Sequence, residues 1–198
     1  VTLDPQEYGR FGISVAVGEG VIAVGASYEN ILDDITVIDG AGRVYIYGSA
    51  TGALTYTLES PNAEFAGHFG FSIAIADGQI VIGAFDETAN GQDEAGRAYI
   101  YNIATQTFNT LVSEAPEQHG LFGNSVAAGN GLILIGAETE TSGDVTDAGN
   151  VYVYNTAGAI QATLTNPDPV EWSTFVWSVA IDVNFFIVGA YDEVYILE

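Results

Sequence analysis

The sequence predicts an all-β fold, a β-propeller of four four-stranded blades, and three observations support this. Four copies of one pattern fill the 198-residue chain, each with a Gly-Ala pair, at positions 25, 83, 136 and 189. Each copy holds short apolar or aromatic segments separated by turn residues, and no stretch shows helical periodicity. A repeat of about 50 residues with several strands is typical of a propeller or a related array, because one unit cannot bury both of its faces alone.

Each repeat opens on a strand that alternates apolar and small residues. The four segments are FGISVAV, FGFSIAI, FGNSVAA and FVWSVAI, which begin at Phe11, Phe69, Phe122 and Phe175. Because the intervening residues are small rather than charged, we expect both faces of this strand to be packed, as in an inner propeller strand. The serine of each segment recurs at one strand position, so we interpret it as a structural residue that bonds neighbouring blades, not as a nucleophile.

The second repeat shows how the other three strands follow. A tight turn at Asp77-Gly78 leads to an apolar strand at 80–82, and a polar loop occupies 85–94. An aromatic strand is expected at 97–101 and a more polar outer strand at 107–112. Four antiparallel strands in this order form one blade. The loop after Gly-Ala is longest in the first repeat, and it is almost absent in the fourth.

The repeats predict one domain over residues 1–198. Blades are expected at about residues 4–60, 61–115, 116–166 and 167–198, with residues 1–3 completing the last blade. The N-terminal segment resembles the ends of the other outer strands, so we expect it to close the ring and remove the open sheet edge. Two chains could instead exchange strands into an eight-bladed ring, or the chain could be excised from a longer propeller. A monomer is favoured over a strand-swapped dimer because it avoids the entropy cost of association.

The chain is strongly acidic. It has 26 Asp and Glu residues against three arginines and no lysine, a formal net charge of −23. This charge repels nucleic acid and anionic membranes, and no apolar run reaches the roughly 18 residues that span a bilayer, so we expect neither nucleic-acid binding nor membrane insertion. The absence of cysteine excludes disulfides and thiol catalysis. The acidity fits either solubility in a salty medium or a requirement for divalent cations.

The repeated residues resemble the FG-GAP repeats of integrin α-subunit propellers and of many microbial surface proteins. Three Phe-Gly pairs match the "FG" and the four Gly-Ala pairs match the "GA", while Ala-Gly-x-x-Tyr-x-Tyr at 41–47, 95–101 and 148–154 matches the next strand. The fourth repeat departs from the family, with Val176 in place of the first glycine. The resemblance implies a secreted or cell-surface adhesion module, often with Ca²⁺ in the loop after Gly-Ala.

Two acidic loops are the candidate calcium sites. Ca²⁺ takes six to eight oxygen ligands from carboxylates and carbonyls. The candidate ligands in the second and third loops are Asp86, Glu87, Asn90, Asp93, Glu138, Glu140, Asp144 and Asp147. The second loop is the nearest match to the family's calcium loop, although its spacing differs. The alternative is that these acids reflect only the overall composition.

The irregular fourth repeat contains both tryptophans. We predict Trp172 as a ligand contact, because rim tryptophans commonly contact sugars or proteins, and we expect Trp177 in the core. The predicted function is a non-enzymatic extracellular module that presents its loops to a glycan or protein ligand. The alternatives are a structural subunit of a larger surface assembly or filament, which apolar patches on two opposite faces would favour, and a hydrolase with a converging acid pair.

Overall fold

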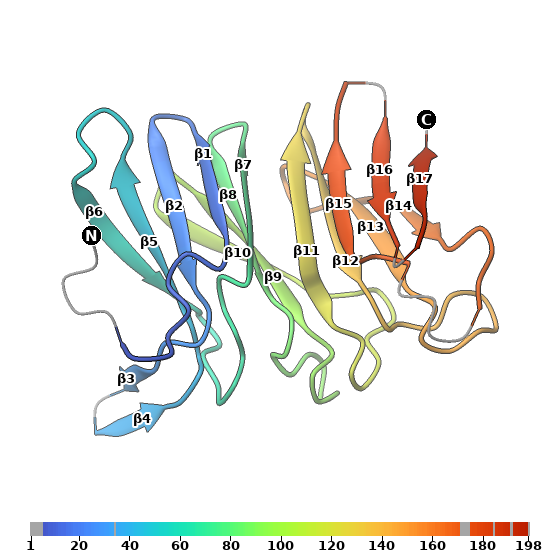
Figure 1. Ribbon diagram of the computed structural model, residues 1–198, viewed down its shortest axis with the longest axis horizontal. Coiled ribbons are helices and arrows are strands. Elements are labelled where there is room, and N and C mark those ends of the chain that lie inside the picture. The colour runs from blue at the N-terminus through green and yellow to red at the C-terminus, as the bar shows by residue number, and fades with distance from the viewer. Residues whose placement is uncertain (1–5, 34, 171–174, 184, 191, 198) are drawn as a thin grey trace.

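The computed structural model describes residues 6–33, 35–170, 175–183, 185–190 and 192–197 (Figure 1). This part of the chain is all-β and contains no helix, as the sequence predicts. Four antiparallel sheets, here called sheets 1 to 4, stand side by side in chain order, with the N- and C-terminal sheets at opposite ends of the row (Figure 1).

The first three sheets each have four strands in meander order. Sheet 1 consists of β1 (Val15–Gly18), β2 (Val21–Ala26), β5 (Arg43–Gly48) and β6 (Leu54–Glu59). Sheet 2 consists of β7 (Ser72–Ala76), β8 (Gln79–Ala84), β9 (Arg97–Asn102) and β10 (Thr107–Leu111). Sheet 3 consists of β11 (Phe122–Gly129), β12 (Leu132–Ala137), β13 (Asn150–Asn155) and β14 (Ile160–Thr165). The four strands predicted for the second repeat are therefore confirmed.

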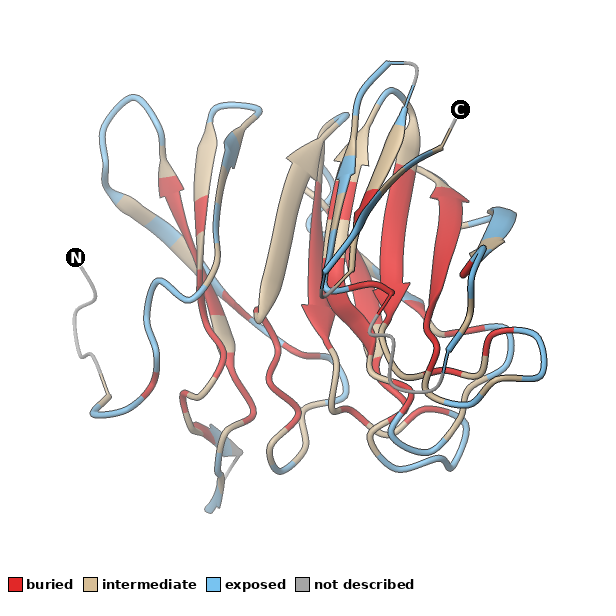
Figure 2. Ribbon diagram, turned by 45° about the vertical axis from the view of Figure 1, so that its right-hand side comes forward, coloured by how far each residue is buried: buried red, intermediate tan, exposed pale blue. Residues whose placement is uncertain are grey.

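Sheet 4 has three strands in the part of the chain that the structure describes. They are β15 (Ser178–Ile181), β16 (Phe186–Gly189) and β17 (Val194–Leu197). Residues 1–3, which the sequence assigns to the outer strand of this sheet, lie outside the described residues. The described residues form an open row rather than a closed ring, and burial is greatest in the middle of the row (Figure 2).

Two-residue turns join the first two strands of sheets 1, 2 and 3. Ala76 of β7 pairs with Gln79 of β8 across Asp77 and Gly78, whose φ angles are 53° and 75°. Two central residues with positive φ define the type I′ turn, whose twist matches that of the flanking strands. The Asp-Gly signal is therefore confirmed.

The long loop of the first repeat contains a hairpin that the sequence did not predict. Strands β3 (Ile31–Asp33) and β4 (Thr36–Ile38) pair in antiparallel fashion, with Leu32 opposite Val37. Apolar residues on both sides of a short acidic turn favour this pairing. The surrounding loop is polar, so these few apolar residues do not stand out as strands in the sequence. Leu32 and Val37 remain largely exposed.

The hydrophobic core lies between the sheets. We call the side of a sheet that faces its predecessor the rear face, and the side that faces the next sheet the front face. The front face of sheet 1 packs on the rear face of sheet 2 through Ala23, Val44 and Ile46 against Ile80, Ile82 and Tyr99. The same arrangement joins sheets 2 and 3 through Val81, Ala98 and Ile100 against Ile133, Ile135 and Tyr152. Sheets 3 and 4 meet through Leu134, Val151 and Val153 against Val179, Val188 and Tyr195.

A serine of the inner strand region links each of the first two sheets to the next. Ser14 donates a hydrogen bond to the carbonyl of Gly70 at 2.6 Å, and Ser72 donates one to the carbonyl of Gly123 at 2.8 Å. The structural role predicted for these serines is confirmed at both positions. In the third sheet the equivalent Ser125 hydroxyl is buried without a hydrogen-bond partner among the described residues, and the neighbouring Asn124 donates to the carbonyl of Val176 at 2.9 Å instead.

Trp177 does not lie in the core, so that prediction is wrong. Its side chain is 62% exposed, whereas the preceding Phe175 is fully buried against Tyr195. Both residues lie in the turn and bend that precede β15, where strand alternation does not apply, and only Phe175 takes the inward position there.

Candidate functional site

The loops that follow the Gly-Ala pairs gather at one end of the sheets, the lower end in Figure 1. In every repeat the third residue after the pair is a glutamate, in the sequences GASYE, GAFDE, GAETE and GAYDE. Each glutamate accepts a hydrogen bond from a tyrosine of the aromatic strand, in the pairs Glu29–Tyr45, Glu87–Tyr99, Glu140–Tyr152 and Glu193–Tyr195. The Gly-Ala-x-x-Glu spacing was a readable signal that the sequence analysis missed.

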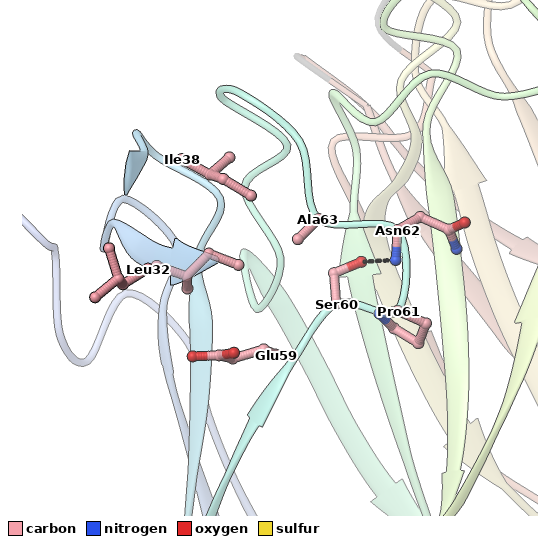
Figure 3. A pocket seen from close by; sticks show the side chains of 8 residues that line it. Leu32, Ile38, Glu59, Ser60, Pro61, Asn62 and Ala63 are labelled. Carbon is pink, nitrogen blue, oxygen red and sulfur yellow. Dashed lines mark hydrogen bonds between the residues drawn. The ribbon is translucent and has the colours of Figure 1, made fainter. Parts of the chain in front are cut away.

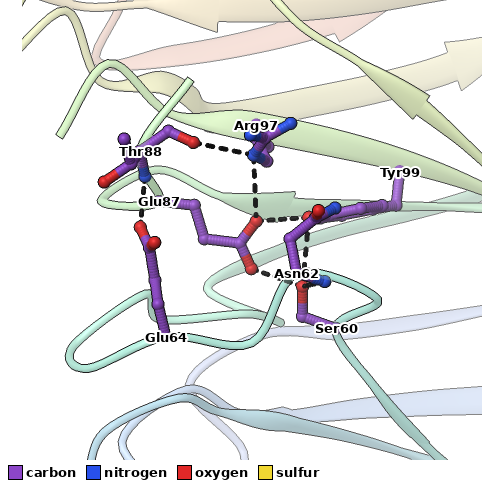
Figure 4. Close-up of polar contacts among 7 residues, drawn as sticks. All are labelled: Ser60, Asn62, Glu64, Glu87, Thr88, Arg97 and Tyr99. Carbon is purple, nitrogen blue, oxygen red and sulfur yellow. Dashed lines mark hydrogen bonds and ion pairs between the residues drawn. The ribbon is translucent and has the colours of Figure 1, made fainter. Parts of the chain in front are cut away.

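Glu87 is the centre of the most extensive of these clusters (Figure 4). Its carboxylate is fully buried and accepts hydrogen bonds from the hydroxyls of Ser60 and Tyr99. Asn62 donates to the Tyr99 hydroxyl at 3.0 Å, and Arg97 Nε lies 3.7 Å from the Glu87 carboxylate. Ser60 and Asn62 follow the outer strand of sheet 1, so this cluster joins the loop of sheet 2 to the preceding sheet.

Burial changes the acidity of two of the loop glutamates. Loss of hydration raises the pKa of Glu87 to about 7, although the hydrogen bonds from Ser60 and Tyr99 and the charge of Arg97 oppose the shift. Burial raises the pKa of Glu140 to about 7 in the same way, against opposing hydrogen bonds that include that of Tyr152. Both groups therefore titrate near neutral pH.

Two histidines connect these loops to neighbouring segments. His68 Nδ1 lies 2.6 Å from a carboxylate oxygen of Asp86, and its ring packs between Tyr28 and Phe85. His119 Nδ1 lies 2.6 Å from Glu94. Sequence reasoning did not pair either histidine with an acid, because 18 and 25 residues separate the partners.

An acid-lined pocket of about 400 Å³ opens between the second loop and the segment that enters sheet 2. Its lining residues are Glu64, Phe65, Ala66, Asp86, Thr88, Asp93 and Glu94. The Glu64 carboxylate accepts a hydrogen bond from the Thr88 amide, which fixes one wall. Phe65 is 76% exposed at this pocket, an uncommon position for a large aromatic side chain in a surface this acidic.

A second pocket of about 300 Å³ lies between the β3–β4 hairpin and the segment after β6 (Figure 3). It is lined by Ile31, Leu32, Ile38, Glu59, Ser60, Pro61, Asn62 and Ala63. Glu59 pairs with Arg43 at 2.8 Å, so the charged group at its edge is neutralised. This pocket has little charge of its own and shares Ser60 with the buried cluster.

The predicted calcium ligands are not arranged as a metal site in the described part of the chain. Glu87 and Glu140 point inward to their tyrosines, and Asp86 is paired with His68. Glu138 is half-buried and accepts a hydrogen bond from Asn124, and Asp144 is exposed. Among the described residues no group of three or more acidic or histidine side chains is close enough to hold a metal ion.

The remaining predicted ligands are turn residues or line the acid-lined pocket with Asp86. Asn90 and Asp147 have positive φ angles of 51° and 54°, so both serve as turn residues. Asp93 lines the acid-lined pocket, and its backbone carbonyl accepts a hydrogen bond from the His119 amide. Trp172, the predicted ligand contact, lies outside the described residues. The described residues form no helix long and apolar enough to cross a membrane.

One comparison with known families supports the sequence resemblance. Residues 56–101 match the family model of the FG-GAP repeat. The matched segment runs from β6 of sheet 1 to β9 of sheet 2, so it includes Phe69, the Gly83-Ala84 pair and the buried Glu87 cluster. No curated protein sequence matches the chain. Residues 56–101 are therefore similar to an FG-GAP repeat, the repeat that the sequence pattern indicates.

Proposed function

We propose that this chain is a non-enzymatic, secreted or cell-surface binding module whose sheets are propeller blades and whose loops contact a protein ligand. The observation that carries the proposal is the acid-lined pocket on a rigid frame. Buried Glu–Tyr pairs and the Asp86–His68 contact hold the surrounding loops in place. A preorganised surface loses less conformational entropy when a ligand binds.

The chemistry of this pocket favours a basic segment of a protein over a glycan. Four carboxylate side chains line it, those of Glu64, Asp86, Asp93 and Glu94, and the chain has a net charge of −23. An exposed phenyl ring beside carboxylates suits an arginine or lysine, because the ring face attracts a cation while the carboxylates bind it. Phe65 supplies this exposed phenyl ring. A glycan remains the alternative ligand class.

We expect Phe65→Ala to weaken binding of a lysine- and arginine-containing peptide roughly tenfold, as for a residue central to an interface. Fluorescence anisotropy with a labelled basic peptide would measure this, with a glycan array run in parallel. The matched control is Val183→Ala, a similarly exposed apolar residue between β15 and β16. Failure of the wild-type protein to bind either class, or equal binding by Phe65→Ala, would contradict the proposal.

Calcium binding stays a prediction from the family resemblance. A bound ion requires Asp86 to exchange its histidine partner for the metal and neighbouring loop oxygens to converge. Thermal unfolding with excess Ca²⁺ and with EGTA tests this. Calcium that binds only the folded state at a hundredfold excess over Kd stabilises by about 2.7 kcal/mol, so a raised midpoint is expected. An unchanged midpoint would leave the acidity as a solubility feature.

The alternative function, a structural subunit of a larger surface assembly, has one observation in its favour. Apolar side chains are exposed at both ends of the row of sheets, including Val17 on sheet 1 and Ile196 on sheet 4. Exposed apolar patches of this kind indicate contact with another protein surface.

A further inference from the structure

The first and last sheets of the row each present an apolar face that no neighbouring sheet of the described chain covers, although Phe11 packs on Tyr45 at one end of the first face. The rear face of sheet 1 is formed by Val15, Val17, Ile22, Val24, Tyr45 and Tyr47, which lie opposite one another in the strand register. Val15 and Val17 are 67% and 73% exposed, and they line an apolar hollow of about 420 Å³. None of these six residues is acidic, and Glu59, which the register places at the edge of the same face, is paired with Arg43 at 2.8 Å.

The front face of sheet 4 is the second unpartnered surface. It is formed by Ser178, Ala180, Ile187, Gly189, Val194 and Ile196, again placed together by the register. Val194 and Ile196 are 67% and 65% exposed, whereas Val188 and Tyr195 on the opposite side pack against sheet 3. None of these six residues is charged.

These two faces are the two halves of an interface that the chain already uses three times. Residues at the position of Ile196 in the earlier sheets are Ile46, Ile100 and Val153, and each is at most 3% exposed because the next sheet covers it. The phenylalanine that opens each repeat shows the same asymmetry. Phe69, Phe122 and Phe175 are fully buried, but Phe11 of sheet 1 is 41% exposed. The front face of sheet 4 is therefore of the type that packs on a rear face, and the rear face of sheet 1 is of the type that packs on a front face.

The glycines of the Gly-Ala pairs show where a further sheet would dock. A Cβ atom on Gly25 or Gly83 would lie 2.0 Å or 1.9 Å from the carbonyl oxygen of Gly70 or Gly123, the Phe-Gly glycine of the following sheet. At Gly189 the three nearest atoms all belong to Ser178 of the same sheet. Gly189 has the same residue type and strand register as Gly25 and Gly83, but no carbonyl of a following sheet is among the three atoms nearest to its added Cβ. By equivalence, the carbonyl that fits there is that of Gly12.

We propose that the front face of sheet 4 docks onto the rear face of sheet 1 of a second copy of this chain. Sheets 1 and 4 of one copy lie at opposite ends of its row, so neither covers the other (Figure 1). Two copies related by a twofold axis make this contact twice and close a ring of eight sheets. Identical faces used head to tail form a closed ring when the rotation between subunits permits it.

The uncharged faces allow this contact despite the charge of the chain. Two copies with a net charge of −23 each repel one another at low ionic strength, and salt screens this repulsion. The proposed dimer is therefore stronger in high salt, which distinguishes it from association through ion pairs.

Sedimentation equilibrium of the wild-type chain and two face variants tests the proposal. We expect the wild type in high salt to have twice the monomer mass of 20.8 kDa. Val17→Arg on the rear face and Ile196→Arg on the front face should each weaken the dimer by roughly a hundredfold or more, because each spoils both contacts of the ring. Ile35→Arg is the matched control, since Ile35 is 95% exposed outside both faces, and it should leave the dimer intact.

Sedimentation equilibrium of an equimolar mixture of Val17→Arg and Ile196→Arg tests whether the two faces bind each other. The intact front face of Val17→Arg can dock onto the intact rear face of Ile196→Arg, so a one-to-one dimer with one contact should form again. Val17 and Ile196 are exposed within one chain, so circular dichroism should show both variants folded. A monomer at every concentration, a dimer insensitive to both substitutions, a mixture that stays monomeric, or a mass that grows without limit would each overturn the proposal. A monomer that Val17→Arg destabilises would indicate closure of the ring within one chain.

Discussion

Gly83→Ala should lower the free energy of unfolding by about 3 kcal/mol or more, as expected for overpacking at a rigid contact. The added Cβ would lie 1.9 Å from the carbonyl oxygen of Gly123 in the next sheet. Because that carbonyl also accepts the hydrogen bond from Ser72, the sheets can separate only by losing both the bond and the packing between them. Urea unfolding followed by tyrosine fluorescence measures the change.

Gly189→Ala is the matched control for this prediction. It has the same Gly-Ala sequence and the same serine beside it, but no carbonyl from a following sheet within the chain. At low salt and low protein concentration, where the proposed dimer dissociates, we expect a loss of less than about 1 kcal/mol, because the Ser178 side chain can rotate away from the added methyl group. Equal destabilisation by both substitutions would show that crowding by the serine, rather than docking of the next sheet, makes glycine necessary.

The free energy of unfolding should fall as the pH rises from 5 to 8. Glu87 and Glu140 have pKa values of about 7 in the folded protein, above the ordinary value of 4.5. Between these values the folded protein binds more protons than the unfolded chain, so stability is greatest at low pH and is lost as the pH rises through 7. The effect is on the order of 3 kcal/mol for each glutamate. Urea titrations at pH 5, 6, 7 and 8 measure it.

The double variant Glu87→Gln and Glu140→Gln separates this effect from general charge repulsion. Both amides stay neutral at every pH, so we expect the slope between pH 5 and 8 to become much flatter. Glu19→Gln, at an exposed turn, removes a charge without removing a buried carboxyl and should leave the slope nearly unchanged. A double variant that keeps the wild-type slope would show that these glutamates are not the groups that titrate.

Much of the fold can be predicted from the repeat. The alternation at Ser72–Ala76 and the Asp-Gly turn after it correctly predicted β7 and its pairing with β8, because period and turn chemistry are local properties. The β3–β4 hairpin was missed, since a few apolar residues inside a polar loop give a weak signal. The core position predicted for Trp177 was wrong, because the sequence does not say which residue of an aromatic pair faces inward.

The candidate site was predicted less well than the fold. Sequence reasoning identified the acidic loops, but it treated Glu87 and Glu140 as surface ligands like Asp93. In the structure both glutamates are buried beneath the loops against tyrosines of the following strand. A carboxylate's direction depends on tertiary contacts with residues such as Ser60, which is 27 residues away in the chain. Composition alone cannot distinguish such a buried acid from a solvated one.

The sequence by itself determined that four similar β units follow one another, where their strands and turns lie, and that the surface is strongly acidic. Those features depend on residue period, glycine and turn chemistry, and charge, all of which are local. Only the tertiary structure decided which glutamates are buried, that His68 and His119 pair with Asp86 and Glu94, and which two faces the neighbouring sheets leave uncovered. Those features depend on packing between sheets, where residues far apart in sequence set one another's burial and hydration.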